Sequence, residues 1–227
     1  MALRYALKND FNYAWLVNND TVVDPEALPE MVKRLQEKPK AGICGSVLMN
    51  YERPERMCAL GGIYDRWFGQ ALSLEGDKLY DPKKFDRYQK LERKIDYVVG
   101  ASMLVSRQFL EEIGLMSEDY FLFFEEIDWI VRAKGKYTLA LAPKSLVYHK
   151  CSVSVRKKEA EGEKQPNHCG ALFNYYITRN RLIFTRKYYP YALPIVYLSI
   201  LGYIIDRLRI GDRVNSKIIW ETAFGKG

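Results

Sequence analysis

Residues 15–25, WLVNNDTVVDP, hold the change of pattern that decides the fold. Residues 13–17 form a short apolar run bounded by polar residues, which is typical of a buried strand. The run stops at residues 18–20, Asn-Asn-Asp, and Asp24 and Pro25 then predict the cap and the first position of a helix. Asn and Asp favour turns, but α/β sheets also bind ligands beyond the carboxyl ends of their strands. The stretch alone leaves both interpretations open.

Composition limits the classes of protein that need to be considered. The chain has 227 residues, of which 48% are hydrophobic and 28% charged, so it is globular and large enough for one domain or one and a half. Its net charge of +7 favours an anionic partner, such as nucleic acid, a nucleotide diphosphate or an anionic membrane surface. The four cysteines form no CxxC pair, and a reducing cytoplasm is the default expectation. A zinc cluster of His149, Cys151, His168 and Cys169 matches none of the usual spacings.

Hydrophobic periodicity predicts further elements along the chain. We expect the tail of a helix in residues 1–10, a helix at 25–38 with Leu28, Met31, Val32 and Leu35 on one face, and a strand at 41–49. Residues 50–94 are predicted to be irregular, and residues 95–107 to form two strands around Gly100. A helix from 108, a helix within 121–135 ended by Gly135, strands at 137–143 and 145–150, and helices at 168–189 and 191–210 complete the expectation.

Glu125, Glu126 and Asp128 are the second group of candidate functional residues. They follow the aromatic run 121–124, and carboxylates at a helix start are favoured by the helix dipole, which gives a structural explanation. Burial of Glu126 against the phenylalanines would instead raise its pKa and make it a plausible general base. His149 ends a predicted strand, where it is either structural or a ligand. Asp20 and His149 together would suit Mg²⁺ or Mn²⁺.

Five segments in one order resemble the family 2 glycosyltransferases. They are LVNNDTVVDPEAL, VVGASMLVSRQFLEEIG, FLFFEEIDWIVRAKGKY, LVYHK and YYITRNRLIFTRKYYP, which together lie within residues 1–190. The sequence is most similar to the rhamnosyltransferase-like bacterial branch, which builds cell-surface polysaccharides. The resemblance implies a partial GT-A (Rossmann-like) α/β fold, with a mixed sheet flanked by helices and a C-terminal helical extension. It also implies inverting transfer of a sugar from a nucleotide-diphosphate donor to a glycan or lipid-linked acceptor.

The resemblance also implies roles for individual residues. Asn18, Asn19 and Asp20 match the donor-binding DxD position, where Asp20, Asn18 and His149 would hold the Mg²⁺ or Mn²⁺. Glu125 and Glu126 match the motif whose second member deprotonates the acceptor hydroxyl, and Gly100, Ala101 and Asp128 would lie on the acceptor side. We expect Asp20 and His149 to lie close together, and Glu126 to face the crevice while Asp128 points elsewhere, because positions two apart lie on different faces of a helix.

Two departures from the family pattern lead to an alternative. The family usually has Asp where this chain has Glu126, and a displacement of about 1 Å can cost about 10²-fold in rate. The family's opening strands are also absent, which predicts a truncated chain with an unpaired sheet edge. The alternative is therefore a non-catalytic remnant that at most binds glycan or a partner. A nucleic-acid-binding protein is disfavoured, because the basic residues match no known module.

The C-terminal part predicts a membrane-associated tail. Residues 191–205 are apolar except for Ser199, and fifteen residues are fewer than the ~20 that span a bilayer. Arg207, Arg209, Arg213 and Lys217 follow, which suits an interfacial helix on an anionic surface. We expect a glycosyltransferase domain at 1–155, a charged linker at 156–167 and a helical tail at 168–227. The protein would then be cytoplasmic and peripheral on the inner face of the plasma membrane, with an apolar face of the tail left uncovered.

Overall fold

The computed structural model describes residues 2–150 and 168–225. The predicted linker and Cys151 of the zinc hypothesis lie outside these residues. The chain forms two compact units. The first unit comprises residues 1–63, 72–117 and 126–151, and the second comprises residues 64–71, 118–125 and 152–227. Each unit is described on its own.

A mixed sheet is the centre of the first unit, which confirms the predicted fold class. Its strands follow the order β1-β7-β3-β8-β2, and β4 (Met57–Ala59) pairs with β3. The bounds are β1 Tyr13–Val17, β7 Ser102–Ser106, β3 Ala41–Asn50, β8 Thr138–His149 and β2 Thr21–Val23. Only β3 and β8 run parallel, and the other pairs within this sheet are antiparallel. β1 therefore lies at one edge of the described sheet and β2 at the other.

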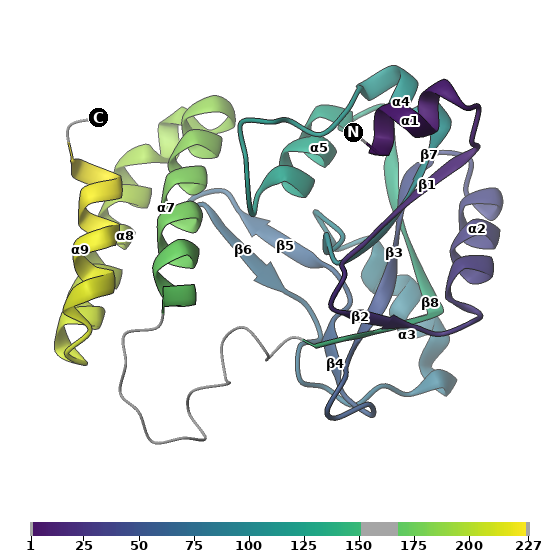
Figure 1. Cartoon of the computed structure of the whole chain (residues 1–227), viewed down its shortest axis with the longest axis horizontal. Helices are drawn as coiled ribbons and strands as arrows, with labels where there is room; N and C mark the ends of the chain where they lie inside the picture. Colours follow the sequence, from purple (N-terminus) through teal and green to yellow (C-terminus); the bar gives the residue numbers. More distant parts are fainter. Residues whose placement is uncertain (1, 151–167, 226–227) are drawn as a thin grey trace. The chain divides into compact units, whose positions relative to one another are not determined.

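Helices cover both faces of this sheet (Figure 1). On one face, Met31 and Leu35 of α2 (Ala27–Glu37) pack with Cys44 and Leu104. On the other face, the main core receives side chains from α1 (Ala2–Lys8), α3 (Phe85–Glu92), α4 (Arg107–Ile113) and α5 (Glu125–Ala133). Alternation of side chains along β3 supplies both layers, because successive strand residues point to opposite faces.

A chain of buried polar side chains crosses four strands in their order. The Trp15 indole N–H donates to Ser102 Oγ at 3.0 Å, and Ser102 Oγ lies 2.8 Å from Ser46 Oγ. The Ser145 hydroxyl then donates to Ser46 at 2.9 Å. Because Ser46, Ser102 and Ser145 are all at most 5% exposed, these bonds satisfy groups that would be costly to bury alone. They fix the register of β1, β7, β3 and β8 near the strand ends.

The start of α2 differs from the prediction. The helix begins at Ala27, and Asp24 instead accepts the Glu26 N–H at 2.9 Å and closes a turn before the helix. A short polar side chain can form such a turn in place of a cap. Of the predicted apolar face, Met31 and Leu35 are buried, whereas Leu28 is 39% exposed.

Three other predicted segments also differ. Residues 50–94 are ordered into β4, the β5–β6 hairpin (Gly62–Asp65 and Gln70–Ser73), η1 (Pro82–Lys84) and α3. In the segment predicted as two strands around Gly100, only β7 forms. The two predicted strands at 137–150 are one strand, β8, whose register with β3 shifts where Ser46 pairs with Ala142 and Val47 with Leu146. Residues 143–145 have no paired residue on β3 at this shift, because Pro143 has no N–H to donate to the ladder.

Within the described residues, the second unit contains the helices α7 (His168–Tyr188), η2 (Pro190–Ala192), α8 (Leu193–Arg209) and α9 (Arg213–Phe224). Val196, Ile200 and Ile204 of α8 are buried against Leu182 and Ile219. The stretch Pro190–Arg209 is 20 residues long and apolar enough to cross a membrane by length and composition, with 22% of it buried. This stretch is longer than the fifteen-residue apolar run at 191–205, and that it does not span the membrane stays a prediction.

Candidate active site

The turn after β1 is attached to the segment that precedes β7. The Asn18 N–H donates to the Ala101 carbonyl at 3.0 Å, and the Thr21 hydroxyl donates to the Asn18 carbonyl at 2.7 Å. Because Val17 pairs with Ser102, the antiparallel register of β1 and β7 sets Asn18 opposite Ala101. Asn18 and Asn19 are exposed, so their side chains remain accessible at the end of the sheet.

Asp20 and His149 meet at the same end of the sheet, as predicted. His149 Nε2 lies 3.1 Å from Asp20 Oδ1, although 129 positions separate the two residues. The pairing of β2 with β8 sets Thr21 opposite His149, and the Lys150 N–H donates to the Asp20 carbonyl at 3.0 Å. The two side chains are 42% and 19% exposed, respectively. Strand register therefore places an accessible carboxylate beside an imidazole.

These two side chains fit a hexacoordinate divalent cation as neighbouring ligands. Ligand atoms about 2.1 Å from such an ion, at right angles, lie about 3.0 Å apart, close to the 3.1 Å between Asp20 and His149. One carboxylate and one imidazole are also a donor set that suits Mn²⁺. Among the described residues, no group of three His, Cys, Asp or Glu side chains could hold a metal. Phosphate oxygens or water would have to complete the coordination.

The Glu126 side chain lies next to Gly100, and both residues belong to the first unit. A Cβ added to Gly100 would be 3.7 Å from Glu126 Oε1, so the carboxylate faces this glycine. Burial raises the pKa of Tyr97 to about 12, and the charge of Glu126 adds to this rise. The Tyr97 hydroxyl therefore lies near the Glu126 carboxylate. Since Ala101 follows Gly100 and accepts from Asn18, the segment 100–101 connects Glu126 with the turn that carries Asp20.

Glu125, the first residue of α5, carries a buried carboxyl group. Burial raises the pKa of Glu125, and a hydrogen bond from its own backbone opposes this rise. Its Oε2 atom is buried and has no hydrogen-bond partner among the described residues. The Glu126 Oε2 atom is buried as well, as the sequence analysis predicted for this carboxylate. Glu125 belongs to the second unit and Glu126 to the first.

Asp128 lies in a different setting from Glu126. Its side chain is fully buried and accepts from Arg132 Nε at 2.9 Å. Arg132 also donates to the carbonyls of Ile113 and Leu115, at 2.9 and 2.7 Å. The structure does not bring Asp128 together with Glu126 and Gly100. Its assignment to the acceptor side stays a prediction, and the geometry favours a structural role.

The segment just before α5 has an unusual backbone conformation that the sequence analysis missed. Phe123 and Phe124 adopt φ angles of 67° and 73°, a left-handed conformation that is strained for bulky residues. The Asn180 side-chain amide donates to the carbonyls of Leu122 and Phe123 at 2.7 and 3.0 Å. Asn180 is fully buried on α7, and such a buried polar residue within the apolar pattern of a helix was the available signal.

Comparison with known proteins identifies the family. The model of the "Glycosyltransferase like family 2" matches residues 2–165, so the chain belongs to this family, which supports sugar transfer in general. No curated protein matches the sequence. Twenty-seven chains of solved structures match. One is the mannosyltransferase PcManGT from Pyrobaculum calidifontis in complex with GDP-Man and Mn²⁺, with 12% identity and a TM-score of 0.49. The alignment covers 100% of this chain and 66% of that one.

Proposed function

We propose that this chain transfers a sugar, with inversion, from a nucleotide-diphosphate donor to a glycan or lipid-linked acceptor. The pairing of Asp20 with His149 at the end of the sheet is the observation that carries the proposal. The rhamnosyltransferase-like sequence pattern favours a role in the synthesis of bacterial cell-surface polysaccharide. Asn18 and Asn19, exposed in the same turn, are the proposed additional contacts to the donor diphosphate.

Asp20, His149 and Asn18 would hold the Mg²⁺ or Mn²⁺. When bound, such an ion neutralises the charge that gathers on a departing diphosphate. Glu126 acts as the general base. Its carboxylate accepts the proton of the acceptor hydroxyl as that oxygen forms a bond to the anomeric carbon and the bond from this carbon to the diphosphate oxygen breaks. Attack on the face opposite the leaving group, with no covalent enzyme intermediate, inverts the configuration.

Gly100 and Ala101 form the proposed acceptor side. Because Gly100 has no side chain, an acceptor hydroxyl can approach Glu126 Oε1 from the direction that a Cβ would occupy, 3.7 Å away. The hydrogen bond from Asn18 to Ala101 keeps this segment attached to the donor turn. This backbone hydrogen bond would thus link the donor side of the site to the acceptor side.

The variant Glu126→Gln tests the base. It keeps the size of the side chain but cannot accept a proton, so transfer should fall by about 10²-fold or more while donor binding stays within about twofold. Transfer is measured by release of nucleoside diphosphate from a panel of nucleotide sugars, and donor binding by calorimetry with Mn²⁺. Glu118→Gln is the matched control. An equal loss of donor binding and transfer in Glu126→Gln would mean that Glu126 is structural.

We also propose that α8 lies on an anionic membrane surface at the cytoplasmic face. Leu198, Ile205 and Leu208 are 67%, 48% and 52% exposed and share one side of the helix. Ile195 is half-buried, and Ile200 and Ile204 pack inside the second unit, so only part of the apolar surface of α8 is left uncovered.

Two of the arginines at the end of α8 already form ion pairs within the chain. Arg207 pairs with Asp212 and Arg209 with Asp206, each at 3.5 Å. Arg213 is exposed and forms no ion pair among the described residues. A basic residue near an anionic surface contributes about 1 kcal/mol, and salt screens this attraction.

Flotation with vesicles that contain anionic lipid tests this membrane proposal. The chain should float with the vesicles at low salt and be released as salt rises. The double variant Leu198→Asp, Ile205→Asp should not float, whereas Glu118→Gln should float like the unmodified chain. Flotation that persists at high salt would indicate a spanning helix, and no flotation at low salt would exclude the peripheral attachment.

A further inference from the structure

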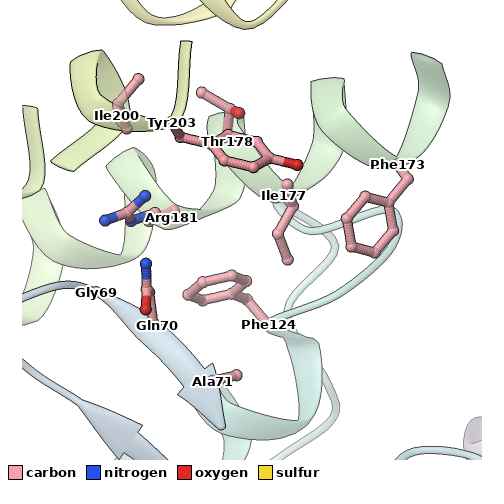
Figure 2. A pocket seen from close by; sticks show the side chains of 10 residues that line it. All are labelled: Gly69, Gln70, Ala71, Phe124, Phe173, Ile177, Thr178, Arg181, Ile200 and Tyr203. Atoms are coloured by element: carbon pink, nitrogen blue, oxygen red, sulfur yellow. The ribbon is translucent and has the colours of Figure 1, made fainter. Parts of the chain in front are cut away.

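The second unit contains a cavity that is lined by none of the residues proposed for the donor, the metal, the base or the acceptor. It has a volume of about 260 Å³. Its walls come from the hairpin tip, the segment before α5, α7 and α8 (Figure 2). The lining residues are Gly69, Gln70, Ala71, Phe124, Phe173, Ile177, Thr178, Arg181, Ile200 and Tyr203. All of them belong to the second unit, so the cavity does not depend on how the two units are placed.

Arg181 is the charged group of this cavity. It is only 8% exposed. Its Nε donates to the Phe68 carbonyl at 2.8 Å, and its Nη2 donates to the same carbonyl and to the Ser199 hydroxyl. All of these acceptors are neutral, and Arg181 forms no ion pair with a carboxylate among the residues that the structure describes. Burial lowers the pKa of Arg181 to about 10, so the guanidinium still carries its charge at neutral pH.

A buried cation without an anionic partner is costly, and natural proteins usually pair it. Burial is the main cause of the lowered pKa of Arg181, and interactions with Tyr64 and Asp65 oppose it. However, the Asp65 carboxylate accepts from the N–H groups of Trp67 and Phe68, at 2.9 and 3.1 Å, instead of from Arg181. The cavity therefore presents a positive charge with no carboxylate bonded to it among the described residues, although Asp65 lies near enough to interact with that charge.

The rest of the cavity wall is mainly apolar. Phe124, Phe173, Ile177 and Ile200 supply rings and aliphatic groups. In Figure 2, Arg181 and Gln70 lie toward one end of the view and Phe173 toward the other. Tyr203 donates to Asn174 at 3.3 Å, so this hydroxyl is already engaged. A ligand that fits needs an anionic end for Arg181 and an apolar portion for the remaining walls.

We infer that this cavity binds a phosphate group carried on an apolar chain, with Arg181 as the phosphate contact and Phe124, Ile177 and Ile200 around the first part of the chain. Arginine suits phosphate, because hydrogen bonds between a guanidinium and a phosphate are charge-assisted. The Nε and Nη2 atoms of Arg181 already donate to Phe68 and Ser199, so Nη1 is the atom that would donate to the phosphate. Ligand pockets usually measure about 300–1,000 Å³, so this cavity suits the head and the beginning of a longer ligand. Binding at this site needs neither the donor nor the metal, and where the ligand is a lipid-linked acceptor the inference rests on the proposed sugar transfer.

Two sources of this chemistry can be separated by probes. A phosphate monoester on a chain represents a lipid-linked substrate, and dihexanoyl phosphatidylglycerol represents a bilayer phospholipid, whose phosphate is a diester. Dodecyl phosphate, dihexanoyl phosphatidylglycerol, inorganic phosphate and dodecyltrimethylammonium should each be titrated into the chain by calorimetry, without metal and below the concentrations at which they self-assemble.

Dodecyl phosphate should bind at least about tenfold more tightly than dodecyltrimethylammonium, because only the phosphate can accept a charged hydrogen bond from Arg181. It should also bind at least about tenfold more tightly than inorganic phosphate, because only the dodecyl chain contacts the apolar walls. Equal binding of phosphatidylglycerol would identify a bilayer lipid as the source, and binding of the monoester alone would identify a lipid-linked phosphate. If dodecyltrimethylammonium binds as tightly as dodecyl phosphate, the inference is wrong. If inorganic phosphate binds as tightly as dodecyl phosphate, the cavity does not bind an apolar chain.

Variants decide whether the probe occupies this cavity. Arg181→Gln removes the charge but keeps a donor for the Phe68 carbonyl, and it should weaken dodecyl phosphate binding about tenfold or more. Ala71→Trp fills the cavity from the exposed β6 strand and leaves Arg181 in place, so it tests the site even where Arg181→Gln unfolds. Arg186→Gln, an exposed position on the same helix, and Leu72→Trp are the matched controls and should bind normally.

Unchanged binding in both Arg181→Gln and Ala71→Trp would overturn the assignment. Asp20→Ala and Glu126→Gln should bind dodecyl phosphate like the unmodified chain, because neither residue lines the cavity. Binding in these two variants, measured beside transfer, therefore separates a failure of this site from a failure of the proposed transfer.

Discussion

The turn after β1 and the helix α5 each pair an aspartate with a basic side chain, but the two pairs differ in their surroundings. Asp20 and His149 are joined by one contact of 3.1 Å and stay partly exposed at the end of the sheet. Asp128 is fully buried, and its partner Arg132 bonds two carbonyls as well. The first pair can exchange its contact for a ligand, whereas the second holds α5 to the end of α4. Accessibility therefore distinguishes the proposed site from the scaffold.

The largest effect on stability is expected when the buried pair is broken. Asp128→Ala leaves Arg132 without its carboxylate, and loss of one partner of a buried pair costs about 3–5 kcal/mol. Because Arg132 is 26% exposed and keeps its carbonyl acceptors, we expect about 2–3 kcal/mol. Urea unfolding measures this difference.

Asp20→Ala is the comparison for that measurement. An exposed carboxylate contributes little to stability, so the free energy of unfolding should change by less than about 0.5 kcal/mol. Asp128→Asn, which keeps the shape of the side chain, should lie between these variants. If Asp20→Ala and Asp128→Ala destabilise the chain equally, the distinction between site and scaffold is wrong.

A smaller and pH-dependent effect is expected at Glu125. Burial raises the pKa of Glu125 above its ordinary value of 4.5, so the folded chain binds more protons than the unfolded chain as pH rises from that value toward the raised pKa. Stability is then lost over this window, because it falls with pH wherever the folded state holds more protons.

Glu125→Gln removes this loss. The variant should unfold at a higher temperature than the unmodified chain at pH 7, and the difference should shrink as pH falls below the ordinary Glu pKa. Calorimetry at a series of pH values measures it, with the exposed Glu118→Gln as control. A difference that is independent of pH would show that burial of the charge is not the cause.

Part of this comparison was predictable from the sequence and part was not. Asp20 and His149 each follow a strongly apolar strand pattern, and their approach depended only on the strands pairing as the family pattern implies. The burial of Asp128 could not be predicted, because it depends on carbonyls of Ile113 and Leu115 that a helical pattern does not place. The same holds for Phe123 and Phe124, whose apolar run before the predicted helix gave no sign that their backbone is left-handed.

The irregular segment 50–94 was missed for a related reason. Its short strands alternate weakly and gain their order from non-local bonds, such as the Met57 N–H to the Lys78 carbonyl at 2.8 Å and the Leu60 N–H to the Leu74 carbonyl at 3.0 Å. Tertiary contacts of this kind override local propensity. Arg181 was visible in the sequence only as one basic residue among many, because the cavity around it is assembled from four separate segments.

Metal-dependent binding of nucleoside diphosphates is the most direct test of the central claim, that Asp20 and His149 form the donor site. GDP, UDP and dTDP should be titrated by calorimetry with Mn²⁺ into the unmodified chain, Asp20→Ala, His149→Ala and Asp10→Ala, a control carboxylate that is 89% exposed. We predict binding of at least one diphosphate that EDTA abolishes, a loss of about tenfold or more in Asp20→Ala and His149→Ala, and no change in Asp10→Ala. Equal binding in all four proteins, binding that survives EDTA, or no binding by the unmodified chain would contradict the claim.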